Sequence, residues 1–127
     1  MTLWLYSRTT ALRTIKRRHL DITTTTITAS NQYPAVNSAA IFTVTLREGT
    51  TGLSKPVRIW HILPNGELHE NGTHNTGADG VYKFTHKYAS AGQRVYYAEF
   101  AGDSTYEASS GTFTVYVGTP ATTEKAN

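Results

Sequence analysis

The sequence predicts an all-β domain, a β-sandwich of about seven antiparallel strands. Short segments alternate between apolar and polar residues, and turn signals rich in Gly, Asn and Pro separate them at intervals of about 8–12 residues. Threonine, valine, isoleucine and tyrosine recur throughout, which favours strands over helices. A chain of 127 residues is long enough for one domain with a core and too short for two.

The alternating segments define the expected strands. Within 39–47, Ala40, Phe42, Val44 and Leu46 lie on one side, as in a half-buried strand. The segment 67–76 is weakly apolar, so two short strands or an irregular meander are expected there. The expected strands are Ile22–Ala29, Ala39–Arg47, Pro56–Leu63, Glu67–Asn71, Thr73–Thr76, Val81–Tyr88, Gln93–Phe100 and Thr112–Val117.

Charge divides the chain into a basic leader (1–20), the β domain (21–118) and a polar linker or tail (119–127). The leader holds five basic and no acidic residues, and the remainder holds seven basic and nine acidic ones. The folded part therefore lacks the basic cluster that nucleic-acid binding requires. The leader does not match a secretory signal. It could lie on an anionic membrane surface, but we favour a cloning remnant, a reading-frame extension or a frayed tail, and expect no membrane contact.

Nothing in the sequence indicates an enzyme. There is no cysteine, hence no disulfide and no thiolate metal site. The spacing of His69 and His74 is one residue longer than in a zinc-protease motif, and the Asn-Gly pair between them would break the required helix. His61 and His86 fall on inward sides of their strands and are interpreted as histidines at the rim of the core. We expect no catalytic residues, no metal and no cofactor.

One glycosylation signal is present. Asn71 begins the sequon Asn-Gly-Thr in a stretch that looks like a turn, where acceptor residues of this kind lie. Asn71 is therefore a candidate glycosylation site.

The connection before the last strand carries a large aromatic residue among small polar ones. It reads FAGDSTYEASS, from Phe100 to Ser110. We expect Tyr106 to close the end of the sandwich by burying its ring under the loop, with its hydroxyl bonded to the backbone. Asp103, after Gly102, is expected to accept backbone N–H groups in the turn.

This connection resembles that of prokaryotic immunoglobulin-like repeat domains, which occur in tandem in bacterial and archaeal surface proteins. In that family an aromatic residue ending a strand is followed by a small residue, Gly, Asp and, three residues later, Tyr. Asp79-Gly80 with Phe84, and a Gly-containing loop and Pro before the third strand, also match. The resemblance covers about residues 22–118 and implies an immunoglobulin-like sandwich in which Gly102, Asp103, Tyr106, Asp79, Gly80 and Phe84 are structural. Arg94 departs from the pattern, because the family often has an aromatic residue there.

Alternation also predicts an aromatic outer face. If Val57, Ile59 and His61 point inward, Arg58 and Trp60 point outward. The same alternation turns Tyr97, Glu99 and Tyr116 outward on the last two strands. The family's strand order would place these residues on one sheet. The candidate ligand or partner site is Arg58, Trp60, Tyr97, Glu99 and Tyr116. Ordinary cross-strand pairing or contact with a neighbouring repeat would account for the same residues.

The resemblance and this face together lead to a functional expectation. We expect a non-catalytic module of a prokaryotic cell-surface or secreted protein, acting in spacing, presentation or adhesion. Its partners would be neighbouring repeats, and possible ones include a surface protein or polysaccharide. The alternative is a carbohydrate-binding accessory module of an extracellular enzyme that uses Trp60 and Tyr97. A binder of anionic surfaces through residues 8–18 ranks last.

Overall fold

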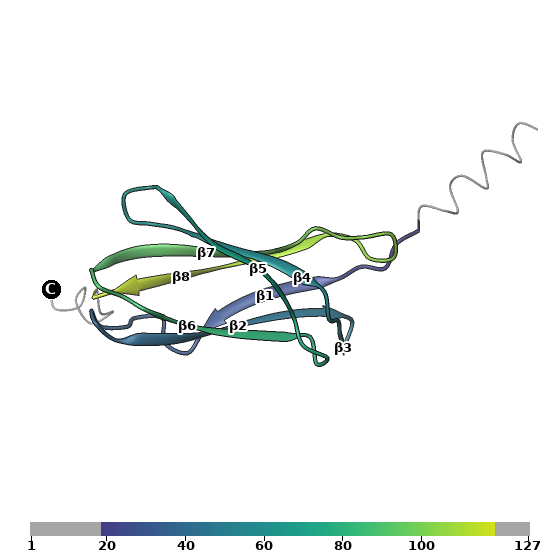
Figure 1. The fold of residues 1–127 in the computed structure, drawn as a ribbon, viewed down its shortest axis with the longest axis horizontal. Helices are drawn as coiled ribbons and strands as arrows, with labels where there is room; N and C mark the ends of the chain where they lie inside the picture. Colours follow the sequence, from purple (N-terminus) through teal and green to yellow (C-terminus); the bar gives the residue numbers. More distant parts are fainter. Residues whose placement is uncertain (1–18, 119–127) are drawn as a thin grey trace, which may run out of the picture.

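The computed structural model describes residues 19–118, which form two antiparallel sheets packed face to face (Figure 1). In one sheet β2 (Ala39–Glu48) pairs with β1 (Thr24–Ala29), β3 (Thr51–Gly52) and β6 (Val81–Lys87). The other sheet has the order β5 (Leu68–Asn75), β4 (Pro56–Ile62), β7 (Gly92–Phe100) and β8 (Ser109–Val117). The predicted all-β sandwich is confirmed.

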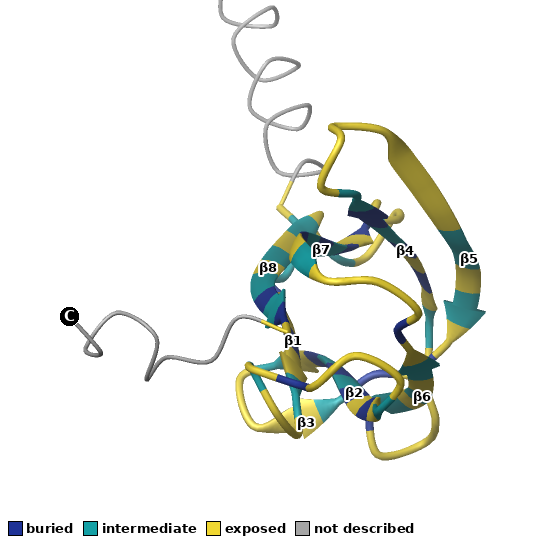
Figure 2. Ribbon diagram, turned by 90° about the vertical axis from the view of Figure 1, so that its left-hand side faces the viewer, coloured by how far each residue is buried: buried dark blue, intermediate teal, exposed yellow. Residues whose placement is uncertain are grey.

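The core lies between the sheets and follows the predicted alternation. The inward side chains of β2, from Ala40 to Leu46, have no exposed surface. They face the inward residues of β4 and β7, which are also buried, and Figure 2 shows buried positions on strands of both sheets. Phe42 is central, since its ring stacks on Phe84 at 4.9 Å between centroids and contacts Tyr96 at 4.3 Å.

Four details of the strands differ from the prediction, among them the last strand, because β8 begins at Ser109 and not at Thr112. The first strand begins at Thr24, because Ile22 is 72% exposed and lies before the sheet pairing. The two-residue strand β3 was not predicted. The segment expected as two short strands is a single strand, β5, in which a register shift accommodates one extra residue beside Gly72. Gly72 has φ +99°, a conformation that other residues rarely adopt, and this lets the pairing continue past the irregularity.

The described chain enters and leaves the sandwich at opposite ends of its long axis (Figure 1). At one end, Asp21 bonds to the β7–β8 connection through Thr105 and Glu107. At the other end, Val117 pairs with Gly92. The nine residues of β8 lie between these points, and at about 3.3 Å per residue they span roughly 30 Å.

Candidate functional site

The outer face of the β5–β4–β7–β8 sheet carries a stack of three side chains. Trp60 lies opposite Tyr97 in the β4–β7 register, and their rings stack at 5.2 Å between centroids with an interplanar angle of 6°. The Arg58 guanidinium carbon lies 4.3 Å from the centre of the Trp60 ring. Arg58 also donates to both carboxylate oxygens of Glu70, with a shortest distance of 2.7 Å.

The indole has a partner from each neighbouring strand. Glu70, which holds Arg58, is paired with Trp60 from β5, and Tyr97 is paired with it from β7. Trp60 and Tyr97 are half-buried, and neither is a freely exposed ring. The outward direction predicted for these side chains agrees with the structure, but a flat, open aromatic surface is not present.

Tyr116 does not extend this stack. It is on the same face, but Tyr97 is paired with Thr112, four residues earlier on β8, which corresponds to about 13 Å along the strand. Tyr116 stacks instead on Tyr33, at 5.5 Å between ring centroids. Tyr33 is 43% exposed and lies before β2, so alternation along the strands could not have identified it. The predicted aromatic row is two separate pairs.

Two other predicted positions have different surroundings from those expected. Glu99 is exposed opposite Arg58 in the register, but the ion pair of Arg58 is made with Glu70, which the sequence analysis did not select. Asn71 lies inside β5, not in a turn, and is half-buried. Its Oδ1 is 2.7 Å from Nδ1 of His61, so this amide is part of the interior hydrogen bonding.

Asp103 organises the connection between β7 and β8. Its Oδ1 accepts hydrogen bonds from the backbone N–H groups of Thr105 (2.8 Å) and Tyr106 (2.9 Å), as expected for this turn. Its Oδ2 lies 2.8 Å from Nζ of Lys55. The ion pair with Lys55, followed by the two backbone donors, lowers the pKa of Asp103 to about 2. Gly102 has φ +86°, and a Cβ there would lie 2.9 Å from the Ala108 nitrogen.

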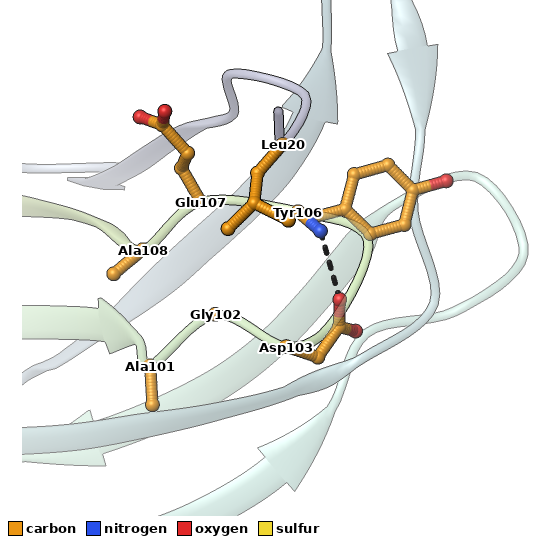
Figure 3. Close-up of a pocket in the computed structure, with 7 residues that line it drawn as sticks. All are labelled: Leu20, Ala101, Gly102, Asp103, Tyr106, Glu107 and Ala108. Carbon is orange, nitrogen blue, oxygen red and sulfur yellow. Dashed lines mark hydrogen bonds between the residues drawn. The ribbon is translucent and has the colours of Figure 1, made fainter. Parts of the chain in front are cut away.

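Tyr106 closes this end of the sandwich less completely than predicted. The residue is half-buried and packs against the edge of the core, while its backbone bridges to Asp21. Figure 3 shows the ring beside Leu20, with the hydroxyl pointing away from the other labelled residues. Within residues 19–118 the hydroxyl makes no hydrogen bond, contrary to expectation, because the ring lies along the surface with Lys55 5.4 Å from its centre. Tyr106 and Leu20 line a shallow hollow of about 580 Å³ together with the other residues labelled in Figure 3.

Asp79 and Gly80 form the turn between β5 and β6, and Phe84 lies within β6, paired with Phe42 of β2. Asp79 Oδ1 accepts from the Val81 N–H at 3.1 Å. Gly80 has φ +81°, and a Cβ there would lie 2.5 Å from the Leu46 carbonyl oxygen. Gly80 is therefore required both by its conformation and by close backbone contact.

The opposite end of the sandwich gathers basic residues. His61, only 1% exposed, has its ring 4.9 Å from His69 and 5.5 Å from His86 between centroids. Tyr88 and Tyr96 are buried below them and share a 2.8 Å hydrogen bond between hydroxyls. We call the six residues His61, His69, His86, Tyr88, Arg94 and Tyr96 the histidine end. Burial lowers the pKa of His61 to about 4 and also lowers that of His86.

Arg94 packs against Tyr88 at this end of the sandwich. Its guanidinium carbon lies 5.0 Å from the centre of the Tyr88 ring. The side chain donates to the Gly92 carbonyl (3.0 Å) and to the Ser90 carbonyl and hydroxyl (3.1 Å each). The planar cation therefore packs against the buried Tyr88 ring as an aromatic ring would, while keeping its charge.

Residues 19–118 contain neither a cluster of metal-ligating side chains nor a helix that could span a membrane. No group of three His, Cys, Asp or Glu side chains in this range has an arrangement that could hold a metal ion. No helix in the same range is long and apolar enough to span a membrane.

Comparison with known proteins identifies the fold. No family model and no curated protein matches the sequence. Among solved structures, the chain is similar to the CARDB domain of a Pyrococcus furiosus protein, in a crystal structure with di-metal ions (TM-score 0.51, 21% identity, covering 75% of this chain and 86% of that one). The solution structure of that domain gives a TM-score of 0.50 at 24% identity, covering 75% and 93%.

A third similar structure is the PKD domain of an M14-like peptidase from a Thermoplasmatales archaeon. Its TM-score is 0.48 at 15% identity, and the match covers 73% of this chain and 94% of that one. At such identities the likeness extends to the fold and not to the site residues. The chain has the immunoglobulin-like fold of the archaeal CARDB domain.

Proposed function

We propose that this domain is a non-catalytic immunoglobulin-like module that spaces or presents its neighbours in a prokaryotic cell-surface or secreted protein. The observation that carries the proposal is the placement of the two chain ends of the described domain. Residue 21 and residue 117 lie at opposite ends of the sandwich, so modules joined in one chain would follow each other along the long axis. The likeness to a CARDB domain supports a non-catalytic module of this class.

The contacts on the outer face favour spacing over sugar binding. A sugar ring stacks on a free aromatic face, and here both Arg58 and Tyr97 already pack against the Trp60 ring. Opening the stack would also break the ion pair of Arg58 with Glu70. The carbohydrate-binding alternative therefore requires a rearrangement, while a spacer requires none.

A tandem fusion of two copies of the full chain tests the proposal. We expect small-angle X-ray scattering to give an elongated particle, with the second module adding about 30 Å or more to the maximum dimension. We also expect urea midpoints unchanged from those of the single chain. A compact, side-by-side particle would contradict the spacer role.

Titration with cell-wall polysaccharides tests the alternative. We expect no heat of binding in isothermal titration calorimetry for the parent chain, and none for Tyr116→Ala, which leaves the Trp60 stack intact. Saturable binding that is lost in Trp60→Ala and retained in Tyr116→Ala would establish the carbohydrate-binding function instead.

A further inference from the structure

The histidine end surrounds a cavity lined by five basic residues, and the phenol of Tyr88, whose pKa is raised by burial, is the other titratable group in its lining. The cavity, of about 280 Å³, is formed by strands of both sheets and by the β6–β7 connection. Its basic lining residues are His61 from β4, His69 from β5, His86 and Lys87 from β6, and Arg94 from β7. No acidic residue is among those that line it. Glu70 follows His69 in sequence, but it is engaged by Arg58 on the outer face.

Arg94 has no counter-ion among the described residues. It is only 6% exposed, yet every hydrogen bond of its guanidinium goes to a neutral acceptor on Ser90 or Gly92. No carboxylate within residues 19–118 lies within ion-pair distance of it. Arginine is rarely buried without an acidic partner, because taking an uncompensated charge out of water is costly. This charge lies at the wall of a cavity.

The imidazoles of His61 and His86 do not balance the positive charge of Arg94. The charge of Arg94 lowers the pKa of both His61 and His86, in addition to the larger effect of burial. Nδ1 of His61 faces the Asn71 amide oxygen, which only accepts, so this nitrogen carries hydrogen. Within the described residues no fully buried polar side-chain atom lacks a partner. Nε2 of His61, which has no hydrogen bond, is therefore accessible to the cavity.

We propose that this cavity binds an oxyanion group, a carboxylate or a phosphate, which balances Arg94 and is held by the surrounding imidazoles. A negative charge there also favours protonated imidazole, so binding takes up protons from solution. A divalent cation would meet the uncompensated charge of Arg94, which is why an anion is favoured over a metal. This inference does not depend on the spacer function.

The test uses the full chain and two probes, inorganic phosphate and acetate, at constant ionic strength set with sodium chloride. Binding is followed by NMR of the histidine side chains. We expect saturable shifts of the His61 and His86 signals with at least one probe and a dissociation constant of about 1–10 mM near pH 5.5. Acetate is mostly ionised at both pH values, so its binding at about pH 7.5 should be at least about fivefold weaker, because fewer imidazoles are protonated. The stronger probe identifies the preferred anion.

Three variants locate the site. Arg94→Met retains much of the side-chain length but not the charge, and we expect binding to fall at least about tenfold. His69→Gln changes an exposed lining residue and should weaken binding about threefold. His74→Gln is the matched control on the same strand, outside the cavity lining, and should leave binding unchanged. If Arg94→Met does not fold, the contrast between the two histidine variants carries the test.

The proposal is overturned if neither probe shifts His61 or His86 up to about 50 mM near pH 5.5. It is also overturned if His69→Gln and His74→Gln weaken binding equally, or if Zn²⁺ binds the cavity while both anions fail to do so.

Discussion

The two ends of the sandwich are closed by different chemistry. At the loop end, defined by Lys55, Asp103 and Tyr106, an acidic and a basic side chain pair directly at 2.8 Å and a half-buried ring lies between solvent and core. At the histidine end, the tyrosines are fully buried and the groups above them are all basic. The charges of Lys55 and Asp103 balance each other at the loop end. At the histidine end the charge of Arg94 is tolerated only if the nearby imidazoles are neutral or if an anion binds there.

The contrast shows why the two ends should respond differently to mutation and to pH. Packing dominates at the histidine end, where the rings of Tyr88, Tyr96 and His61 are almost inaccessible. Hydrogen bonds of one exposed carboxylate dominate at the loop end. Variants that remove either a buried ring or a charged group therefore show which of the two stabilises each end.

The largest effect is expected for Tyr96→Ala. The ring is completely buried and contacts both Phe42 and His61, so its removal should lower the free energy of unfolding by about 4 kcal/mol. Urea denaturation followed by far-UV circular dichroism measures this change. The neighbouring outward-facing variant Tyr97→Ala is the control and should cost about 1 kcal/mol. Equal losses in the two variants would contradict the assignment of inner and outer faces.

The next effect is a loss of stability on acidification that originates at the histidine end. The pKa of His61 is about 4 in the folded protein and about 6.5 in an unfolded chain. The unfolded state thus binds the proton more readily, so stability is fully present above about pH 6.5 and decreases as the pH falls toward 4. The loss attributable to His61 should be on the order of 2–3 kcal/mol.

Urea midpoints measured between about pH 7 and pH 4 test this. His61→Phe, which does not titrate, should flatten the curve, while His74→Gln should retain the slope of the parent. If the urea midpoint of the parent does not change across this pH range, protonation of His61 does not destabilise the folded protein.

Much of this architecture was predictable, because period-two alternation is a direct consequence of strand geometry. It identified the inward residues of β2, β4 and β7 and the outward direction of Trp60 and Tyr97. The glycine at position 80 was also recognisable as a turn residue, although its close approach to Leu46 was not.

The contacts between side chains were less predictable. The partner of Arg58 is Glu70, because a β-bulge in β5 sets it opposite Trp60, and no local pattern in a weakly apolar segment indicates such a shift. Tyr33 was missed because it lies in a connection whose path depends on pairing with β8. The histidine end combines four strands and the β6–β7 connection. Alternation placed His61 and His86 at the rim of the core, and Arg94 departed from the expected pattern, but no local signal showed that these residues meet.

At the loop end, Tyr106→Ala should have a smaller effect than Tyr96→Ala. Since the ring is half-buried at the edge of the core, we expect a loss of about 2 kcal/mol, below the 3–5 kcal/mol typical of emptying a fully buried aromatic site. Tyr106→Phe is the matched control and should be nearly neutral, because the hydroxyl has no hydrogen-bond partner within residues 19–118. A substantial loss in Tyr106→Phe would show that the hydroxyl is engaged in solution.

The smallest effect is expected for Asp103→Asn, and its pH dependence separates the two ends. The folded pKa of Asp103, about 2, lies below the ordinary value of 3.8. The carboxylate therefore stabilises the fold above about pH 4, and this contribution is lost as the pH falls toward 2. Asparagine keeps an oxygen for the backbone donors but loses the ion pair with Lys55.

The difference in urea midpoint between the parent and Asp103→Asn should be present at neutral pH and should disappear near pH 2. Lys55→Gln, which removes the same ion pair from the other side, should reproduce part of the difference at neutral pH. Because Asp103 is exposed, added salt should also reduce it, whereas the acid-induced loss due to buried His61 should be less sensitive to salt. A difference that persists unchanged near pH 2 would mean that the turn geometry, and not the charge, makes Asp103 stabilising. The stability of the loop end would then depend on uncharged contacts, as that of the histidine end does.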